Sequence, residues 1–130
     1  MKIRAHHLLC IQGFQGYGYS EEFTENMSKV IQNLKSFPDH KIQITTCCDV
    51  LCACCPHNIA NKCAESSNSN EKMIEMDIKV LKTIGLQANT IIEAHDAFQL
   101  VNKYFKSSHI IEICGNCKWK DKCLFFLMKI

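Results

Sequence analysis

The sequence lacks the features that mark a secreted, membrane-spanning or hydrolytic protein. Its longest apolar runs near the two ends, LLCI and LFFLM, are much too short to span a bilayer. The opening residues MKIRAHHLLCIQGF contain no small-residue cleavage site of the kind that ends an export signal. Neither a Gly-x-Ser-x-Gly motif nor a phosphate-binding loop occurs, which argues against a hydrolase. We therefore expect a cytoplasmic protein with no membrane partner.

The sequence also lacks a strong excess of positive or negative charge, and it contains only one arginine. The net charge of +2 is too weak to indicate nucleic-acid binding, and we expect no such partner. Arg4 is the single arginine among 15 basic side chains. A guanidinium holds a carboxylate or phosphate in a planar fork that lysine cannot copy, so Arg4 is a candidate cofactor-binding residue. A composition that favours lysine explains a lone arginine equally well.

Cysteine, in contrast, is abundant, with ten among 130 residues. In a reducing compartment, clustered cysteines bind metal or perform redox chemistry more often than they form permanent disulfides. Six of them form two triads that are far apart in the sequence, and each triad opens with Cys-x-x-Cys. The triads are Cys52, Cys55 and Cys63, and Cys114, Cys117 and Cys123.

Two Cys-x-x-Cys pairs can supply the four sulfurs of a tetrahedral zinc site or of an iron–sulfur cluster. Pro56 follows Cys55 as a proline follows a ligand cysteine in bacterial ferredoxins, which favours an iron–sulfur cluster, 4Fe-4S first, with zinc as the alternative. Thiol–disulfide chemistry is a third reading, although neither pair has the βαβ setting of thioredoxin-type motifs. Six cysteines exceed one four-ligand site and fall short of two, and Cys10 is a seventh candidate ligand.

Two histidines precede Cys10. If residues 4–12 form a helix, His6 and Cys10 lie one turn apart on one face and His7 points about 100° away. We predict that His6 and His7 bind a cofactor; the alternative is that both are hydrogen-bonded structural residues. Cys10 could instead be a small buried hydrophobe. Cys47, Cys48 and Cys54 belong to neither triad.

The second triad lies among basic residues. Lysines there would offset the negative charge of a four-thiolate cluster, or they form an ordinary solvated face. Trp119 would shield a cluster from water or serve as a core anchor. The lysines are Lys118, Lys120, Lys122 and Lys129.

Hydrophobic periodicity predicts a mainly α fold: a single compact domain over residues 1–130, with about five helices, a minor β element and two cysteine-rich metal-binding loops. The polar stretch 65–70 is a candidate substructure boundary, and the aromatic-glycine loop 13–20 either lines a pocket or packs. Ser20, Asn70 and Thr90 are expected N-caps, and Gly85 an expected C-cap. Helices are predicted over 4–12, 21–37, 71–84, 91–105 and 108–114, with a last turn or two after 123 and a strand over 41–47.

Four short motifs together resemble a bacterial and archaeal family, domain of unknown function family 1284. They are R-x-H-H-L-L-C at 4–10, G-Y-S at 18–20, D-x-x-C-x-x-C-P at 49–56 and C-x-x-C-x-W at 114–119. The resemblance implies iron–sulfur binding but no reaction, and it sets Cys47, Cys48 and Cys54 apart as extras. The motif residues that it carries over are Arg4, His6, His7, Cys10, Asp49, Cys52, Cys55, Cys63, Cys114, Cys117 and Cys123.

These observations predict a cytoplasmic, cysteine-rich metal-binding protein. An iron–sulfur cluster would serve electron transfer, sensing or an accessory role beside a redox or enzyme partner protein. The alternative is a structural zinc-binding module for protein interaction without catalysis.

Overall fold

The computed structural model describes residues 1–60, 62–115, 117 and 119–129. The predicted mainly α fold with a small β element is confirmed, and the described residues contain six α-helices. None of the helices found there is long and apolar enough to cross a membrane. The helices are α1 (His7–Gly13), α2 (Glu21–Ser36), α3 (Ser69–Ile84), α4 (Ala94–Tyr104), α5 (Ser107–Cys114) and α6 (Leu124–Lys129).

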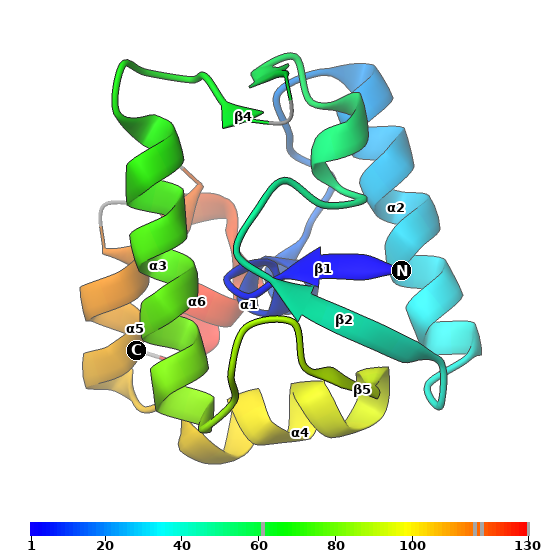
Figure 1. Cartoon of the computed structure of the whole chain (residues 1–130), viewed down its shortest axis with the longest axis vertical. Coiled ribbons are helices and arrows are strands. Elements are labelled where there is room, and N and C mark those ends of the chain that lie inside the picture. Colours follow the sequence, from blue (N-terminus) through cyan, green and yellow to red (C-terminus); the bar gives the residue numbers. More distant parts are fainter. Residues whose placement is uncertain (61, 116, 118, 130) are drawn as a thin grey trace.

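A small three-stranded sheet lies among the helices (Figure 1). Its central strand β2 (Lys41–Thr45) pairs in parallel with β1 (Lys2–Arg4) and antiparallel with β5 (Ile91–Glu93). The alternation of KIQIT places Ile42 and Ile44 on one buried face, with 1% and 0% of their surface exposed. The predicted strand is therefore present, and it is the centre of a sheet.

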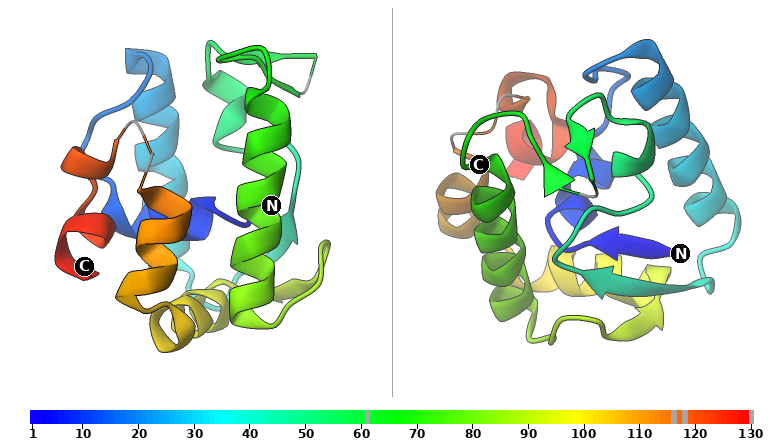
Figure 2. Two further views of the ribbon diagram at one scale, coloured as in Figure 1. Left: turned by 90° about the vertical axis from the view of Figure 1, so that its left-hand side faces the viewer. Right: turned by 45° about the horizontal axis from the view of Figure 1, so that its top comes forward.

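The two cysteine-rich segments lie outside this sheet. The first contains the one-turn 3-10 helix η1 (Cys52–Cys54) and a hairpin of β3 (Asn58–Ile59) and β4 (Lys62–Cys63). The second contains the 3-10 helix η2 (Lys120–Lys122) and joins α5 to α6. Figure 2 shows both segments toward the same end of the molecule, while α4 covers the opposite end.

The predicted helix over 4–12 is wrong at its start. Residues 2–4 form β1, with Ile3 opposite Ile44 and fully buried, and α1 begins only at His7. A three-residue strand has no periodicity of its own, because its stability comes from the partner strand. Arg4 therefore lies at the end of a strand, and His6 at the cap position of α1.

The helix predicted over 91–105 also begins too early. Ile91–Glu93 form the edge strand β5, where Ile91 is 66% exposed, and α4 starts at Ala94. Thr90 does not cap this helix; its hydroxyl donates to the Gln87 carbonyl instead. Residues 91–93 therefore pair with β2 as an edge strand, although their apolar side chains were expected to lie on the inward face of a helix.

Capping was predicted correctly at α2 and at the end of α3. Ser20 Oγ accepts from the Phe23 backbone N–H at 3.1 Å, and Gly85 ends α3 with φ of 76°, where a side chain would be strained. At the start of α3, however, Asn70 is not the cap. Its Oδ1 accepts from the Cys63 N–H at 3.1 Å, while Ser69 Oγ donates to the Cys63 carbonyl at 3.0 Å. The first turn of α3 therefore anchors the end of the first cysteine segment.

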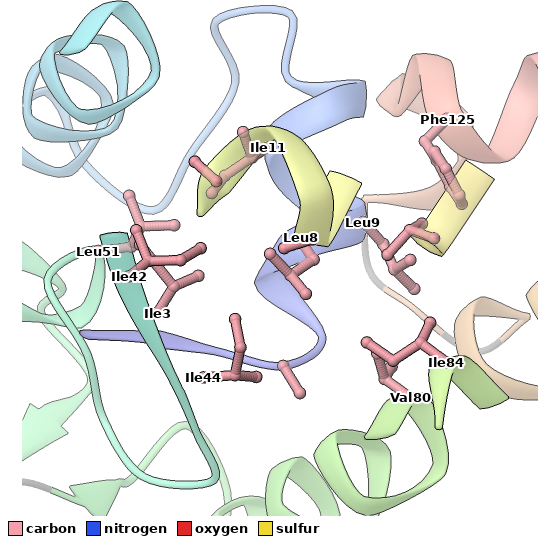
Figure 3. Close-up of a cluster of buried hydrophobic side chains, with 14 of the residues drawn as sticks. Ile3, Leu8, Leu9, Ile11, Ile42, Ile44, Leu51, Val80, Ile84 and Phe125 are labelled. Carbon is pink, nitrogen blue, oxygen red and sulfur yellow. The ribbon is translucent and has the colours of Figure 1, made fainter. Parts of the chain in front are cut away.

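The core is centred on α1, which carries two leucines between the sheet and the outer helices (Figure 3). Leu8 and Leu9 are 0% and 2% exposed. Val80 and Ile84 of α3 line the same core, as does Phe125 of α6. A short helix of seven residues is thus held in place mainly by its apolar contacts.

We expect Leu8→Ala to lower the free energy of unfolding by about 2–5 kcal/mol, because it leaves a cavity at the centre of the core. The control is Ile111→Ala on α5, where the side chain is 55% exposed, and it should change stability by less than about 0.5 kcal/mol. Urea unfolding followed by circular dichroism measures both. Equal losses in the two variants would contradict the assignment of α1 as the core helix.

Candidate metal centre

The single arginine is buried against an acid of α3. Arg4 is 1% exposed, its Nε donates to Asp77 Oδ2 at 2.9 Å, and its Nη2 donates to the Thr46 carbonyl at 3.2 Å. Asp77 is fully buried. Burial alone would lower the pKa of Arg4, but the Asp77 carboxylate raises it, so the guanidinium stays charged. The guanidinium fork is thus engaged inside the protein, and its role as a cofactor-binding group stays a prediction.

The same carboxylate holds the first histidine. Asp77 Oδ1 accepts from the His6 backbone N–H at 2.9 Å and lies 2.7 Å from His6 Nδ1. Burial lowers the pKa of His6, as does the neighbouring His7, and these effects outweigh the attraction of Asp77. Burial alone would raise the pKa of Asp77, but hydrogen bonds from His6 and the charge of Arg4 lower it. The arrangement is therefore a neutral imidazole that donates from Nδ1 to a carboxylate already paired with Arg4.

A second buried carboxylate, Asp49, holds the next histidine. Its Oδ2 accepts from the Arg4 backbone N–H at 2.7 Å and lies 2.8 Å from His7 Nδ1. Its Oδ1 accepts from the backbone N–H groups of Leu51 and Cys52, at 2.9 and 3.1 Å. Burial by itself would raise the pKa of Asp49, but His7 and these N–H groups hold it well below its usual range. Asp49 is thus a buried anion that joins residues 4–7 to the first Cys-x-x-Cys turn.

The two imidazoles form an adjacent pair. Their ring centroids are 4.4 Å apart with planes at 61°, and each Nδ1 faces its own carboxylate. No described residue hydrogen-bonds to either Nε2. Because an ionised carboxylate can only accept, each Nδ1 carries a hydrogen, which leaves each Nε2 as the ring nitrogen that can meet a metal or exchange a proton.

Cys10 brings α1 to the second triad, and together they form the second cysteine group: Cys10, Cys114, Cys117 and Cys123. Burial raises the pKa of Cys10 strongly, and the three neighbouring thiols raise it further. Burial and the other thiols also raise the pKa of Cys114 to about 12. The approach is close, because a side chain at Gly13 would overlap the Cys123 sulfur.

The first triad acquires an extra neighbour, Cys48, and we call Cys48, Cys52, Cys55 and Cys63 the first cysteine group. Burial raises the pKa of Cys48, and its thiol interacts with those of Cys52 and Cys63. Burial also raises the pKa of Cys52, with Asp49 adding to the effect. Cys48 was set aside from the sequence as incidental, yet it lies among the triad thiols.

One set of possible ligands converges in the described part of the chain. Ligand atoms of His7, Asp49 and Cys52 all lie within 4.8 Å of one another, whereas no three cysteine sulfurs there do so. No such set combines sulfurs of both cysteine segments. All ten cysteines are free thiols, and Cys47 is exposed. The structure thus divides the predicted ligands into two groups, each with donors recruited from elsewhere in the chain.

Tyr19 joins the two cysteine segments. Its ring meets His57 at 4.8 Å and Trp119 at 5.3 Å, both edge to face. His57 and Trp119 occupy matching positions, each two residues after the second cysteine of a Cys-x-x-Cys pair. The backbone N–H of Trp119 donates to Cys117 Sγ at 3.4 Å, and the Tyr19 hydroxyl donates to Glu65 at 3.1 Å. Tyr19 therefore packs between the segments, and Trp119 is a half-buried contact residue beside the second group.

The predicted lysine environment of the second group is observed in part. Lys120 Nζ donates to the Gly115 carbonyl at 3.1 Å, and Lys122 Nζ lies 4.2 Å from the centre of the Tyr17 ring. Lys118 and the side chain of Lys129 fall outside the described residues. Two positive charges therefore lie close to this cysteine segment.

Comparison with known families now adds one result. A family model described as a protein of unknown function (DUF1284) matches residues 18–123. The chain belongs to the DUF1284 family. The match covers both triads, Asp49 and Asp77 of this DUF1284 protein, and it begins after the segment that carries Arg4 and Cys10. No curated protein and no solved structure matches the chain.

The two carboxylates that organise this DUF1284 centre received no role from the sequence. In the sequence Asp77 shares one helical face with the apolar residues Met73, Ile74 and Leu81. An acid on an apolar face signals a buried charge with a partner, and the lone Arg4 was the natural partner to consider. Asp49 was recognised only as part of a motif, although an acid three residues before Cys52 can bind the N–H groups of the turn.

We predict that Asp77→Ala destabilises the protein by roughly 3–5 kcal/mol, because it leaves Arg4 buried without a counter-charge. The matched control is the exposed pair Lys79–Glu112, 3.7 Å apart with the Glu112 side chain 62% exposed. Glu112→Ala should cost less than about 1 kcal/mol. Denaturant unfolding of both variants tests this, and comparable losses would contradict the importance of the buried pair.

We also expect the metal-free protein to lose stability on acidification in two stages. The lowered pKa of His6 means that its contribution is present above about pH 6.5 and is lost as pH falls toward the folded-state pKa. The lowered pKa of Asp49 gives a contribution present above about pH 4 and lost below it. Between about pH 4 and pH 6.5, the unfolding free energy should depend less steeply on pH in His6→Asn than in the wild type. An equal pH dependence in the two proteins would refute the buried neutral imidazole.

Proposed function

We propose that this DUF1284 protein is a metal-binding protein that holds an iron–sulfur cluster, with 4Fe-4S favoured, at the second cysteine group. The proposal rests on α1 lying against Cys123, whose sulfur a side chain at Gly13 would overlap, and on the electrostatic interaction of Cys10 with Cys114, Cys117 and Cys123. Four thiols are the donor set of such a cluster. The group also accounts for part of the mismatch between six triad cysteines and sites of four ligands, because Cys10 adds a fourth thiol to the second triad.

The surroundings of these thiols support thiolate ligation. Burial raises the pKa of Cys10 and Cys114, so both are protonated when no metal is bound, and a metal would replace those protons. The hydrogen bond from the Trp119 backbone N–H to Cys117 Sγ is of the type that stabilises a sulfur bound to a metal. No three described sulfurs lie within 4.8 Å of one another, as the ligands of a single ion would. A 4Fe-4S cluster binds each cysteine at a different iron and does not need so close a spacing.

A structural zinc site is the second candidate, because zinc uses the same four thiolates. It is favoured by the position of the group, which ties α1 to the segment before α6: Gln15 Nε2 donates to the Lys122 carbonyl at 3.0 Å. A site of this kind would staple the N-terminal and C-terminal parts of the fold without catalysis.

The proposed role is redox or sensing work beside a redox or enzyme partner protein, in the reducing cytoplasm. Ten free thiols would be hard to maintain in an oxidising compartment. The Nε2 atoms of His6 and His7, which no described residue hydrogen-bonds, offer cofactor-binding or proton-transfer groups.

Anaerobic purification or reconstitution with iron and sulfide tests the proposal. We expect a brown protein with broad visible absorption that bleaches on reduction, and with iron and sulfide in cluster stoichiometry. Cys10→Ala should abolish or strongly diminish the chromophore, whereas Cys47→Ala, at an exposed cysteine outside both groups, should not. A colourless protein with stoichiometric zinc would reject the cluster in favour of the zinc site.

A further inference from the structure

A second metal site is built around His7, and it begins with how that imidazole is held. Every oxygen of Asp49 already accepts two hydrogen bonds: Arg4 N–H and His7 Nδ1 on one, and the N–H groups of Leu51 and Cys52 on the other. A metal bound to Asp49 would have to displace one of these buried donors. The carboxylate is therefore better suited to orient a ligand than to be one, and the orientation leaves His7 Nε2 as the available donor atom.

One sulfur of the first cysteine group, that of Cys52, lies beside this imidazole. His7, Asp49 and Cys52 have ligand atoms within 4.8 Å of one another, and the backbone of Cys52 is bonded to the same carboxylate. Asp49 thus positions the imidazole and the Cys-x-x-Cys turn together. Carboxylate–histidine–metal arrangements of this form recur in metal sites because they fix the tautomer and the ring orientation.

The remaining donors come from the same cysteine segment. The Cys55 N–H donates to the Cys52 carbonyl at 3.0 Å, which closes the turn that carries both thiols. Asn70 and Ser69 of α3 fasten the backbone of Cys63 from the other side. With Cys10 committed to the second group, three triad thiols remain here, one short of a tetrahedral set.

We propose that His7, through Nε2, joins Cys52, Cys55 and Cys63 in a mixed imidazole–thiolate site for a divalent transition metal, with Asp49 as the orienting residue. One imidazole and three thiolates are a donor set typical of structural zinc. The site is distinct from the second cysteine group and does not depend on an iron–sulfur cluster there. One turn of α1 then serves both centres, because His7 and Cys10 lie three residues apart on neighbouring positions of its surface.

Cys48 is the rival fourth donor. Its thiol interacts with that of Cys52 and would complete an all-sulfur set. One observation favours His7 over Cys48. Among the described residues, His7 has a ligand atom within 4.8 Å of those of Asp49 and Cys52, and Cys48 is not part of this set. The two alternatives differ by one nitrogen ligand, which spectroscopy can detect.

The direct test uses the full-length wild-type chain, labelled with ¹⁵N and prepared without metal. Histidine side-chain resonances are recorded before and after saturation with Zn²⁺. We expect the Nε2 resonance of His7 to move to a metal-bound position while its Nδ1 stays protonated. An unchanged His7 Nε2 at saturating zinc would overturn the proposal, and this measurement needs no variant to fold.

Affinity measurements with Co²⁺ as the spectroscopic probe add matched variants. We expect His7→Ala to lose the nitrogen ligand and Asp49→Asn to weaken binding at the first group by roughly 10–100-fold. Cys48→Ala and His40→Ala, the latter at an exposed histidine, should bind as the wild type does. Loss of binding in Cys48→Ala with full binding in His7→Ala would establish the all-sulfur set and reject ours.

The two proposals fail independently. If the first-group site is correct, His7→Ala should lose the nitrogen ligand there and retain the visible chromophore of the second group. If the second group holds no cluster, the Co²⁺ and ¹⁵N results for His7 still stand. A wild-type protein that binds metal only at the second group would overturn the inference and leave the proposed function intact.

Discussion

Two buried carboxylates hold the N-terminal segment in place, and the rest of the centre depends on them. Asp77 of α3 accepts from Arg4 and His6, and Asp49 accepts from Arg4, His7 and the backbone of the first cysteine turn. An unpaired carboxylate in such a position would cost several kcal/mol, so each needs its full set of donors. The geometry of residues 4–7 is therefore specified closely, and with it the direction in which α1 leaves the sheet.

That direction decides which donors meet. From the fixed start of α1, His7 lies beside Cys52 of the first cysteine group and Cys10 interacts electrostatically with the thiols of the second, while Leu8 is buried in the core. A buried ion pair adds little net stability compared with apolar residues of the same size. We therefore interpret the Arg4–Asp77 pair as a device that sets position: it places one short helix between two groups of thiols, which apolar packing alone would locate less specifically.

Much of the architecture could be predicted, and the errors share a physical cause. The helices α2 and α3 have long amphipathic patterns, so their apolar faces and the caps Ser20 and Gly85 were readable locally. The strand β5 and the last residue of β1, Arg4, were predicted as helix because three residues carry no period, and the hydrogen bonds of these strands go to a strand elsewhere in the chain. Asn70 failed as a cap because its side chain binds the backbone of Cys63 instead.

For the centre itself, the sequence alone determined the chemistry of the donors: thiols at Cys-x-x-Cys spacing, a histidine pair, and one arginine in a lysine-rich chain. Local spacing suffices for that, because a tight turn brings its own two thiols together wherever it lies. Only the tertiary structure decided that Cys10 interacts with the thiols of the C-terminal triad, that His7 lies beside Cys52, and that Asp49 and Asp77 orient the two imidazoles. Those partners are far apart along the chain, and what joins them is the need to satisfy charges buried by folding, a requirement that no local pattern contains.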